Sequence, residues 1–376
     1  MMHRLLLLAL MLTASTPAAA DEPLLPMPAV PDHVVTMSER AIHRKEDLTR
    51  TVTHRGDWTR VDKVNPTSIS TEYYQRNCST FPRHVRDKNT GIYTGVWISR
   101  GCHRSPDWDY NPVRTDERRI FLGESCTVWT AWQSARMAGS RMVKTSCVTE
   151  DGIELWYKIT SGYGLLSWAD ATKVERRPVS SAEAEPPADL LKIDHWFTES
   201  APNPANTTPD FEMVMRQDGA PEFARTVKRH GSWLLDEERA GGVRQQLSIS
   251  NPAAGYWLSF HNLVSGTPFL GINQNARPRP AAIDTSPDSG IKRMDRVSET
   301  VLGEQCIWFD MAPGAMHGAH YACRTDDGVA LREEWIGERR ERRVQTATEF
   351  VRRTIVMDEI KPPAELMQPK TWGLPE

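Results

Sequence analysis

The residues of this chain whose chemistry is easiest to assign are its six cysteines. Thiols in a protein form disulfides, redox pairs or metal sites. The chain has no Cys-x-x-Cys motif, which weakens the redox and zinc interpretations. An even number of cysteines in an exported chain favours structural disulfides. The cysteines are Cys78, Cys102, Cys126, Cys147, Cys306 and Cys323.

An internal repeat reduces the number of possible pairings. A segment Leu-Gly-Glu-Ser-Cys ends at Cys126, and a segment Leu-Gly-Glu-Gln-Cys ends at Cys306. Cys147 and Cys323 each begin a segment Cys-x-Thr-x-Asp-Gly, and these two segments lie 176 residues apart. A long, nearly constant step indicates two copies of one domain rather than a short-repeat solenoid. The predicted bridges are Cys126–Cys147 and Cys306–Cys323, with Cys78–Cys102 as an additional bridge in the first copy.

A second group of potential ligands is His317 and His320, with Met311 and Met316 close by. Imidazole and thioether groups are ligands for copper or nickel. However, this segment is rich in glycine and proline, and the first copy has no counterpart. We therefore expect an exposed loop, and neither a metal nor any other cofactor.

Motifs for catalysis are nearly absent from the chain. Ser289 and Lys292 have the Ser-x-x-Lys spacing of penicillin-binding enzymes, but no Lys-Thr-Gly follows them. The sequence also has no Gly-x-Ser-x-Gly, His-Glu-x-x-His or Gly-x-Gly-x-x-Gly motif. We predict a protein that is not an enzyme, with an enzyme of unrecognised site as an alternative.

Arginines gather towards the end of the second copy. They could contact anionic lipid headgroups or an acidic partner. Glutamates are interleaved with them, and that pattern is typical of a solvated hairpin face, which we favour. The arginines are Arg339, Arg340, Arg342, Arg343, Arg352 and Arg353.

Thirteen tryptophans lie mostly in segments predicted to be strands. Large aromatic side chains either fill the core of a curved sheet or line an apolar groove. We expect most of the tryptophans to fill the core. The candidates for ligand contact are Trp97, Trp129, Trp132 and Trp308.

The first residues direct the chain to export. Arg4, an apolar run and the small residues before position 21 make residues 1–20 a signal peptide, cleaved after Ala20. A proline-rich leader follows at 21–31. No later stretch has the ~18 apolar residues of a membrane span. The net charge of −3 provides no general field for nucleic acid. We predict a periplasmic or secreted protein.

The repeat divides the mature chain into two domains. We place the first at 32–199 and the second at 210–370, joined by a proline-rich linker at 200–209. The linker is long enough for independent movement of the copies. Residues 276–290 read as a long loop inside the second copy.

Both copies are predicted to be mainly β. Residues 153–159 alternate apolar and polar side chains, as do 329–335. The preceding Asp-Gly pairs predict two-residue hairpin turns with glycine at positive φ. Short helices are expected only near 181–192 and 358–368, each interrupted by a proline pair. Each copy should form one antiparallel sheet of about six to eight strands, curved or closed.

The order of these features resembles the periplasmic lipoprotein-carrier superfamily and related exported domains of unknown function. The resemblance rests on an early Gly-x-Trp-x-Arg segment at 56–60, a Gly-x-x-Cys segment, the Cys-x-x-x-Asp-Gly hairpin, and Arg-Arg-Pro at 176–178. It implies a half-barrel, a curved and unclosed sheet whose hydrophobic concavity holds acyl chains. The chain lacks the helical pattern of the carriers' lid.

From this resemblance we predict a non-catalytic periplasmic protein that binds an apolar or lipidic ligand in a concave sheet. Its partner would be a lipid or a lipoprotein acyl chain. The alternative is a structural or sensory cell-envelope protein that acts through contacts with an envelope protein.

Overall fold

The computed structural model describes most of the chain. The described residues are 30–42, 46–75, 80–100, 113–134, 141–162, 164–197, 209–264, 268–273, 291–313, 318–337 and 341–374. The predicted signal peptide, Cys78, Cys102, the loop 276–290 and most of the linker 200–209 lie outside these ranges. No helix of the described part is long and apolar enough to cross a membrane.

The two copies supply the same series of eleven strands each. The strands of the first copy are β1 (His33–Ala41), β2 (Leu48–Arg55), β3 (Trp58–Val64), β4 (Ser68–Gln75), β5 (Thr80–Asp87), β6 (Tyr93–Arg100), β7 (Val113–Phe121), β8 (Glu124–Ser134), β9 (Arg141–Thr149), β10 (Glu154–Ser161) and β11 (Gly164–Arg176). Those of the second copy are β12 (Phe211–Gln217), β13 (Ala220–His230), β14 (Trp233–Ala240), β15 (Val243–Asn251), β16 (Tyr256–His261), β17 (Phe269–Asn273), β18 (Lys292–Val301), β19 (Glu304–Asp310), β20 (Ala319–Arg324), β21 (Ala330–Ile336) and β22 (Arg342–Val351).

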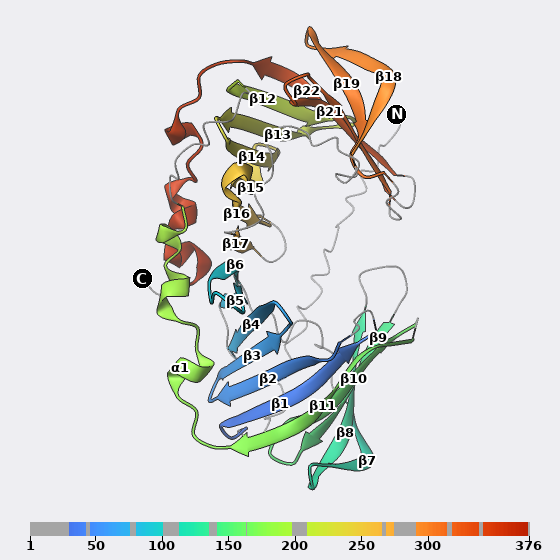
Figure 1. Cartoon of the computed structure of the whole chain (residues 1–376), viewed down its shortest axis with the longest axis vertical. Helices are drawn as coiled ribbons and strands as arrows, with labels where there is room; N and C mark the ends of the chain where they lie inside the picture. The colour runs from blue at the N-terminus through green and yellow to red at the C-terminus, as the bar shows by residue number, and fades with distance from the viewer. Residues whose placement is uncertain are drawn as a thin grey trace, which may run out of the picture.

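All of these strands belong to one antiparallel sheet that is not closed into a barrel (Figure 1). The first copy runs β7-β8-β9-β10-β11-β1-β2-β3-β4-β5-β6 across the sheet. The second continues β17-β16-β15-β14-β13-β12-β22-β21-β20-β19-β18, the same order reversed. The prediction of a mainly β, curved antiparallel fold is confirmed.

The prediction of two separate sheets of about six to eight strands is wrong, because the equivalent strands β6 and β17 pair with each other. Gly271 stands opposite Trp97 in this pairing. A Cβ atom at Gly271 would lie 2.6 Å from the Trp97 ring, so only glycine leaves room for the indole. The backbone hydrogen bonds of this ladder join the copies, which therefore do not move independently.

After its last strand each copy ends in a tail of short helical turns. The proline pairs keep these segments short, as the sequence predicted, and among the described residues only one four-residue stretch is α-helical. The first tail contains α1 (Ser181–Ala184), η1 (Ala188–Leu191) and η2 (Ile193–His195). The second contains η5 (Met357–Glu359), η6 (Ala364–Met367) and η7 (Pro369–Trp372). Figure 1 shows the tails side by side along the middle strands.

The tails cover one face of the sheet, which we call the tail face. Trp196 of the first tail and Trp372 of the second share one hydrophobic core with Ile98 of β6 and Leu270 of β17. The hydroxyl of Tyr256, in the second copy, donates a hydrogen bond of 3.0 Å to the carbonyl of Trp196. The first tail therefore packs on the second copy. The predicted boundary at 200–209 divides the chain but does not separate the contacts of the two copies. The tails therefore cover this face of the sheet, although the sequence shows no helical pattern that predicts a lid.

The opposite face, which we call the inner face, is buried at both ends of the sheet. Val35, Met37 and Leu155 belong to the first end core, and Met213 and Leu331 to the second. Each end core contains one disulfide. The predicted bridges Cys126–Cys147 and Cys306–Cys323 are confirmed, with Cα–Cα distances of 5.4 and 5.2 Å. Two disulfides indicate an oxidising, exported environment.

The two Asp-Gly hairpins have the predicted glycine conformation but a longer loop. Gly152 has φ 89° and Gly328 has φ 88°. The N–H of Thr149 bonds to the carbonyl of Ile153, so three residues, not two, form the loop. The Thr149 hydroxyl accepts the N–H of Ile153, which stabilises this wider turn. Thr325 makes the same contacts in the second copy.

Replacing Gly152 with valine is expected to destabilise the protein by more than about 1 kcal/mol, because a β-branched residue is strained at positive φ. The new Cβ would also lie 2.9 Å from the Val30 side chain. Urea unfolding measures the effect. The control is Gly162→Val, since no atom lies within 4 Å of a Cβ there and its φ is not positive. Equal stability of the two variants would contradict the turn assignment.

Candidate functional site

One row of paired residues shows which side chains share the inner face. Residues directly opposite each other in adjacent strands point to the same side of a sheet. The row passes through Trp97 and Gly271 at the junction, and it ends in the two end cores at Val35 and Met213. Its members are Val35, Val52, Val61, Glu72, Arg83, Trp97, Gly271, Ser259, Ser248, Asp236, Val227 and Met213.

Aromatic rings are only partly covered in the middle of this face. The rings of His261 and Phe269 stack at 4.6 Å, and Trp257 lies 6.1 Å from His261. Trp97 covers Gly271, and the guanidinium of Arg83 lies 5.4 Å from its ring. Trp257 is 36% exposed. We call Trp97, Trp257, His261 and Phe269 the aromatic strip.

Each end of the inner face holds a charged cluster centred on an arginine. Arg50 pairs opposite Met37, and Arg225 occupies the equivalent position opposite Met215. Both methionines are 1% exposed. Charged groups beside an apolar core are costly unless they are paired, so these clusters are candidate functional sites.

The first arginine cluster consists of Arg50, Lys144, Ser146, Glu154 and Tyr157. The Arg50 guanidinium and the Lys144 ammonium each lie 5.0 Å from the centre of the Tyr157 ring. Glu154 accepts a hydrogen bond of 2.6 Å from Ser146 and pairs with Lys144 at 2.7 Å. Burial disfavours the charged carboxylate, but the charges of Lys144 and Arg50 outweigh it and lower the pKa of Glu154. Glu154 thus forms an ion pair with Lys144, whereas Arg50 acts on it through its charge without an ion pair.

The second arginine cluster consists of Arg225, Asp236, His320, Arg324, Glu333 and Gln345. Arg225 pairs with Asp236 at 2.7 Å and also contacts Glu333. His320 lies 3.5 Å from Glu333 and stacks on Trp335 at 4.9 Å.

The pKa values of Glu333 and Arg324 are both lowered in this cluster, for different reasons. Burial raises the pKa of Glu333, but His320 and Arg225 outweigh it, and the net pKa is lowered. Burial lowers the pKa of Arg324, the charge of Glu333 opposes this change, and the charge of Arg225 adds to it, so the net pKa is lowered. No carboxylate of the described residues forms an ion pair with Arg324.

Several buried polar atoms in these clusters have no hydrogen-bond partner within the described ranges. They include Nε of Arg50 in the first cluster, and Nε of Arg324 and Oε1 of Gln345 in the second. Nε2 of His320 makes no short hydrogen bond either, but it faces Glu333 at 3.5 Å. Gln345 is only 4% exposed. Buried polar groups in native proteins are normally hydrogen-bonded, so such atoms mark places where a polar ligand or water can bind.

The structure separates the four tryptophans that the sequence singled out. Trp97 lies in the aromatic strip, whereas Trp308 packs against the second end core. Trp129 lies in β8 beside Val128, on the other side of the strand, with Arg114 at 6.0 Å from its ring. The side chain of Trp132 is outside the described part. These residues do not form one wall.

The arginine clusters were not predicted, although the sequence held one signal. Residues 329, 331 and 335 are apolar, and Glu333 interrupts this alternation where a core residue is expected. A charged residue at an apolar position is informative because charges are rarely buried without a partner. Arg225 and Asp236 carry no comparable signal.

Two surface depressions are polar and lie away from these clusters. One is lined by Glu124, Asp151 and Arg176 and the other by Asp32, Arg55 and neighbouring residues. In the first, Arg176 bonds to both Glu124 and Asp151 and thereby ties the β9–β10 turn to β8. These contacts stabilise the hairpins.

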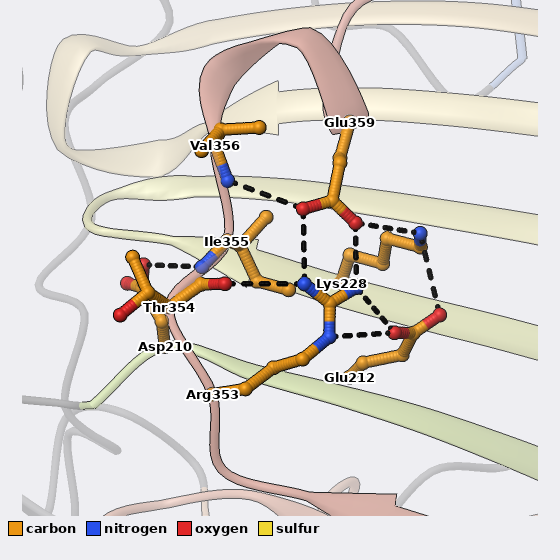
Figure 2. A network of polar contacts seen from close by, with 8 residues as sticks. All are labelled: Asp210, Glu212, Lys228, Arg353, Thr354, Ile355, Val356 and Glu359. Carbon is orange, nitrogen blue, oxygen red and sulfur yellow. Dashed lines mark hydrogen bonds and ion pairs between the residues drawn. The ribbon is translucent and has the colours of Figure 1, made fainter.

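A polar network also fixes the second tail to the sheet (Figure 2). Arg353 binds Glu212 of β12 and Glu359 of η5, and Lys228 of β13 pairs with the same two acids. The N–H of Ile355 donates to Asp210 at 3.2 Å. All partners belong to the chain itself, so this network is structural.

The remaining arginines of the basic run are largely paired as well. Arg342 bonds to Glu334 and Arg352 to Asp327. Arg343 lies 5.9 Å from the ring of Trp335. These contacts agree with the predicted solvated hairpin face, and Arg339 and Arg340 are outside the described residues.

The segment predicted to be an exposed histidine loop is only partly described, and its second histidine lies in a strand. His320 belongs to β20 and to the second arginine cluster, not to an exposed loop. His317 and Met316 lie outside the described part. Among the described residues, no group of three or more His, Cys, Asp or Glu side chains could hold a metal.

Comparisons with known proteins do not identify a family. No protein-family model and no curated protein matches the chain. A solved structure of PNGF-II aligns with 55% of this chain and 40% of its own, at 11% identity and a TM-score of 0.25. A likeness at this level carries no argument about fold or function.

Proposed function

We propose that this is an exported, non-catalytic protein that binds an apolar or lipidic ligand on the inner face of its sheet. The observation that carries the proposal is the partly exposed aromatic strip. On the tail face, the neighbouring residues Ile98, Leu258 and Leu270 are fully buried. The chain thus covers one face of the junction with its own tails and leaves rings accessible on the other.

The environment of the strip suits an amphipathic molecule. Aromatic rings provide apolar contact area, and polar groups set the orientation of a ligand. Arg83 and Glu72 lie in the same row and pair at 3.5 Å. The two arginine clusters flank the strip along the sheet. An elongated ligand with apolar and polar parts could contact the aromatic strip and an arginine cluster at the same time.

The proposal predicts that dodecanoate binds stoichiometrically and quenches tryptophan fluorescence. Trp257→Ala should weaken binding about tenfold, which corresponds to the loss of one aromatic contact. The control is Trp168→Ala. Trp168 is also partly exposed and lies on β11 next to Ala169, which faces the first end core, so its own side chain points to the other face.

Native mass spectrometry of protein purified from the periplasm provides an independent readout. A co-purified lipid supports the proposal. No lipid in the spectrum together with flat dodecanoate titrations would refute it.

A second function, an envelope protein acting through protein contacts, is favoured by the tips of two equivalent hairpins. Leu122 and Leu302 have φ 51° and 53°, which is unfavourable for leucine, and both side chains are more than half exposed. Exposed apolar residues in strained positions often mark contact sites. Crosslinking through cysteines placed at these two positions, in cells, tests for a partner.

A further inference from the structure

We infer that the second arginine cluster is the binding site for an anionic headgroup, a carboxylate or a phosphate, of the ligand. This inference rests on the proposed function and specifies it. The ligand would then be an anionic amphiphile, with its charged end in the second copy and its apolar part directed towards the aromatic strip.

The pairing of charges within the cluster favours an anion beside Arg324. Asp236 and Glu333 both bind Arg225, and Glu333 acts on Arg324 through its charge without forming an ion pair with it. Among the described residues Arg324 forms no ion pair, and its Nη1 donates a hydrogen bond of 3.2 Å to the carbonyl of Gly328. An anion bound between Arg225 and Arg324 would relieve the repulsion between their guanidinium groups.

The hydrogen-bonding groups of the cluster also suit an anion. Nε of Arg324 is buried and has no hydrogen-bond partner within the described ranges, and Nε2 of His320 has only Glu333 nearby, at 3.5 Å. Gln345, like Arg324, has one buried side-chain atom without a partner in these ranges. The oxygen and nitrogen of a glutamine amide are nearly interchangeable by rotation, so Gln345 can supply an N–H donor. Arginine donors arranged in this way are typical of carboxylate and phosphate recognition.

The first copy shows that the fold itself does not require these groups. At the positions equivalent to Arg324, Asp236 and Gln345 it has Val148, Val61 and Ala169, in the same strand register. In its own cluster Glu154 pairs with Lys144. Arg324 therefore has no counterpart in the first copy, and an anion bound beside it would give the ligand one direction on a nearly symmetric sheet.

The solvent reaches the cluster from one side. The side chains of Asp236, His320 and Arg225 are 34%, 29% and 22% exposed. Glu333 lies beneath them at 8%. A headgroup can therefore enter past His320 without disruption of the end core.

The test uses the full chain and three probes with the same alkyl chain: dodecanoate, dodecyl phosphate and dodecanol. The wild-type protein should bind the two anions at least about tenfold more tightly than the alcohol. Arg324→Val, which installs the residue of the first copy, should remove this preference and leave the affinity for dodecanol unchanged. The control Arg342→Val removes an exposed arginine of the same copy and should preserve the preference for the anions.

Thermal unfolding of each variant shows whether it is folded. A second variant, Arg324→Gln, should lose the preference for the anions as Arg324→Val does. Tighter binding of one anion identifies the headgroup as carboxylate or phosphate. Equal affinity of the wild type for all three probes would overturn the anionic site and leave the proposed function intact. A preference that survives in Arg324→Val also overturns it. Binding of none of the probes would remove the proposed function as well.

Discussion

Replacing Trp372 with alanine is expected to lower the free energy of unfolding by about 3–5 kcal/mol, the usual cost of deleting a buried tryptophan. The side chain is 1% exposed, and its indole N–H donates to the carbonyl of Leu366 at 2.8 Å. It packs on Phe260 of the second copy and shares a core with Ile98 of the first. The loss should therefore weaken the attachment of the tail across the junction.

Urea-induced unfolding measures this effect. Trp168→Ala is the matched control, because Trp168 is partly exposed and touches Arg40 at the surface, so we expect a smaller loss. Limited proteolysis adds a local readout, since a released tail should be cut between 352 and 374. A Trp372→Ala protein as stable as the control would show that the tail does not cover the tail face in solution.

Removal of the bridge Cys306–Cys323 by a double alanine substitution is expected to cost about 2–5 kcal/mol. The bridge closes a sequence separation of 17 residues and lies fully buried in the second end core. Its loss releases conformational entropy in the unfolded chain and removes packing from the core. The equivalent bridge Cys126–Cys147, with a separation of 21, should have a similar effect.

Denaturant unfolding of the two double variants gives the costs, and non-reducing peptide mapping of the wild type gives the connectivity. Substitution of a single partner provides the control, because it breaks the bridge but leaves one thiol. A mapped bridge between the two copies would contradict the pairing. The same mapping also tests the predicted Cys78–Cys102 bridge, which lies outside the described residues.

The sequence predicted best where the deciding contacts are local or repeated. The disulfide partners followed from the equivalence of Cys126 with Cys306 and of Cys147 with Cys323. The positive φ of Gly152 and Gly328 followed from turn chemistry that involves only a few neighbouring residues. The predicted loop length was wrong because the N–H of Ile153 donates a hydrogen bond to the Thr149 hydroxyl and closes the hairpin one residue wider.

By itself, then, the sequence determined the duplication, the β class, the two bridges and the short proline-limited tails, since each depends on residue type and spacing along the chain. Only the tertiary structure decided that β6 and β17 join the copies, because any extended edge offers the same backbone donors and acceptors. The need for glycine at 271 becomes apparent only with Trp97 opposite. The arginine clusters likewise bring together β13, β14, β20, β21 and β22, and no local pattern records which buried charges will meet.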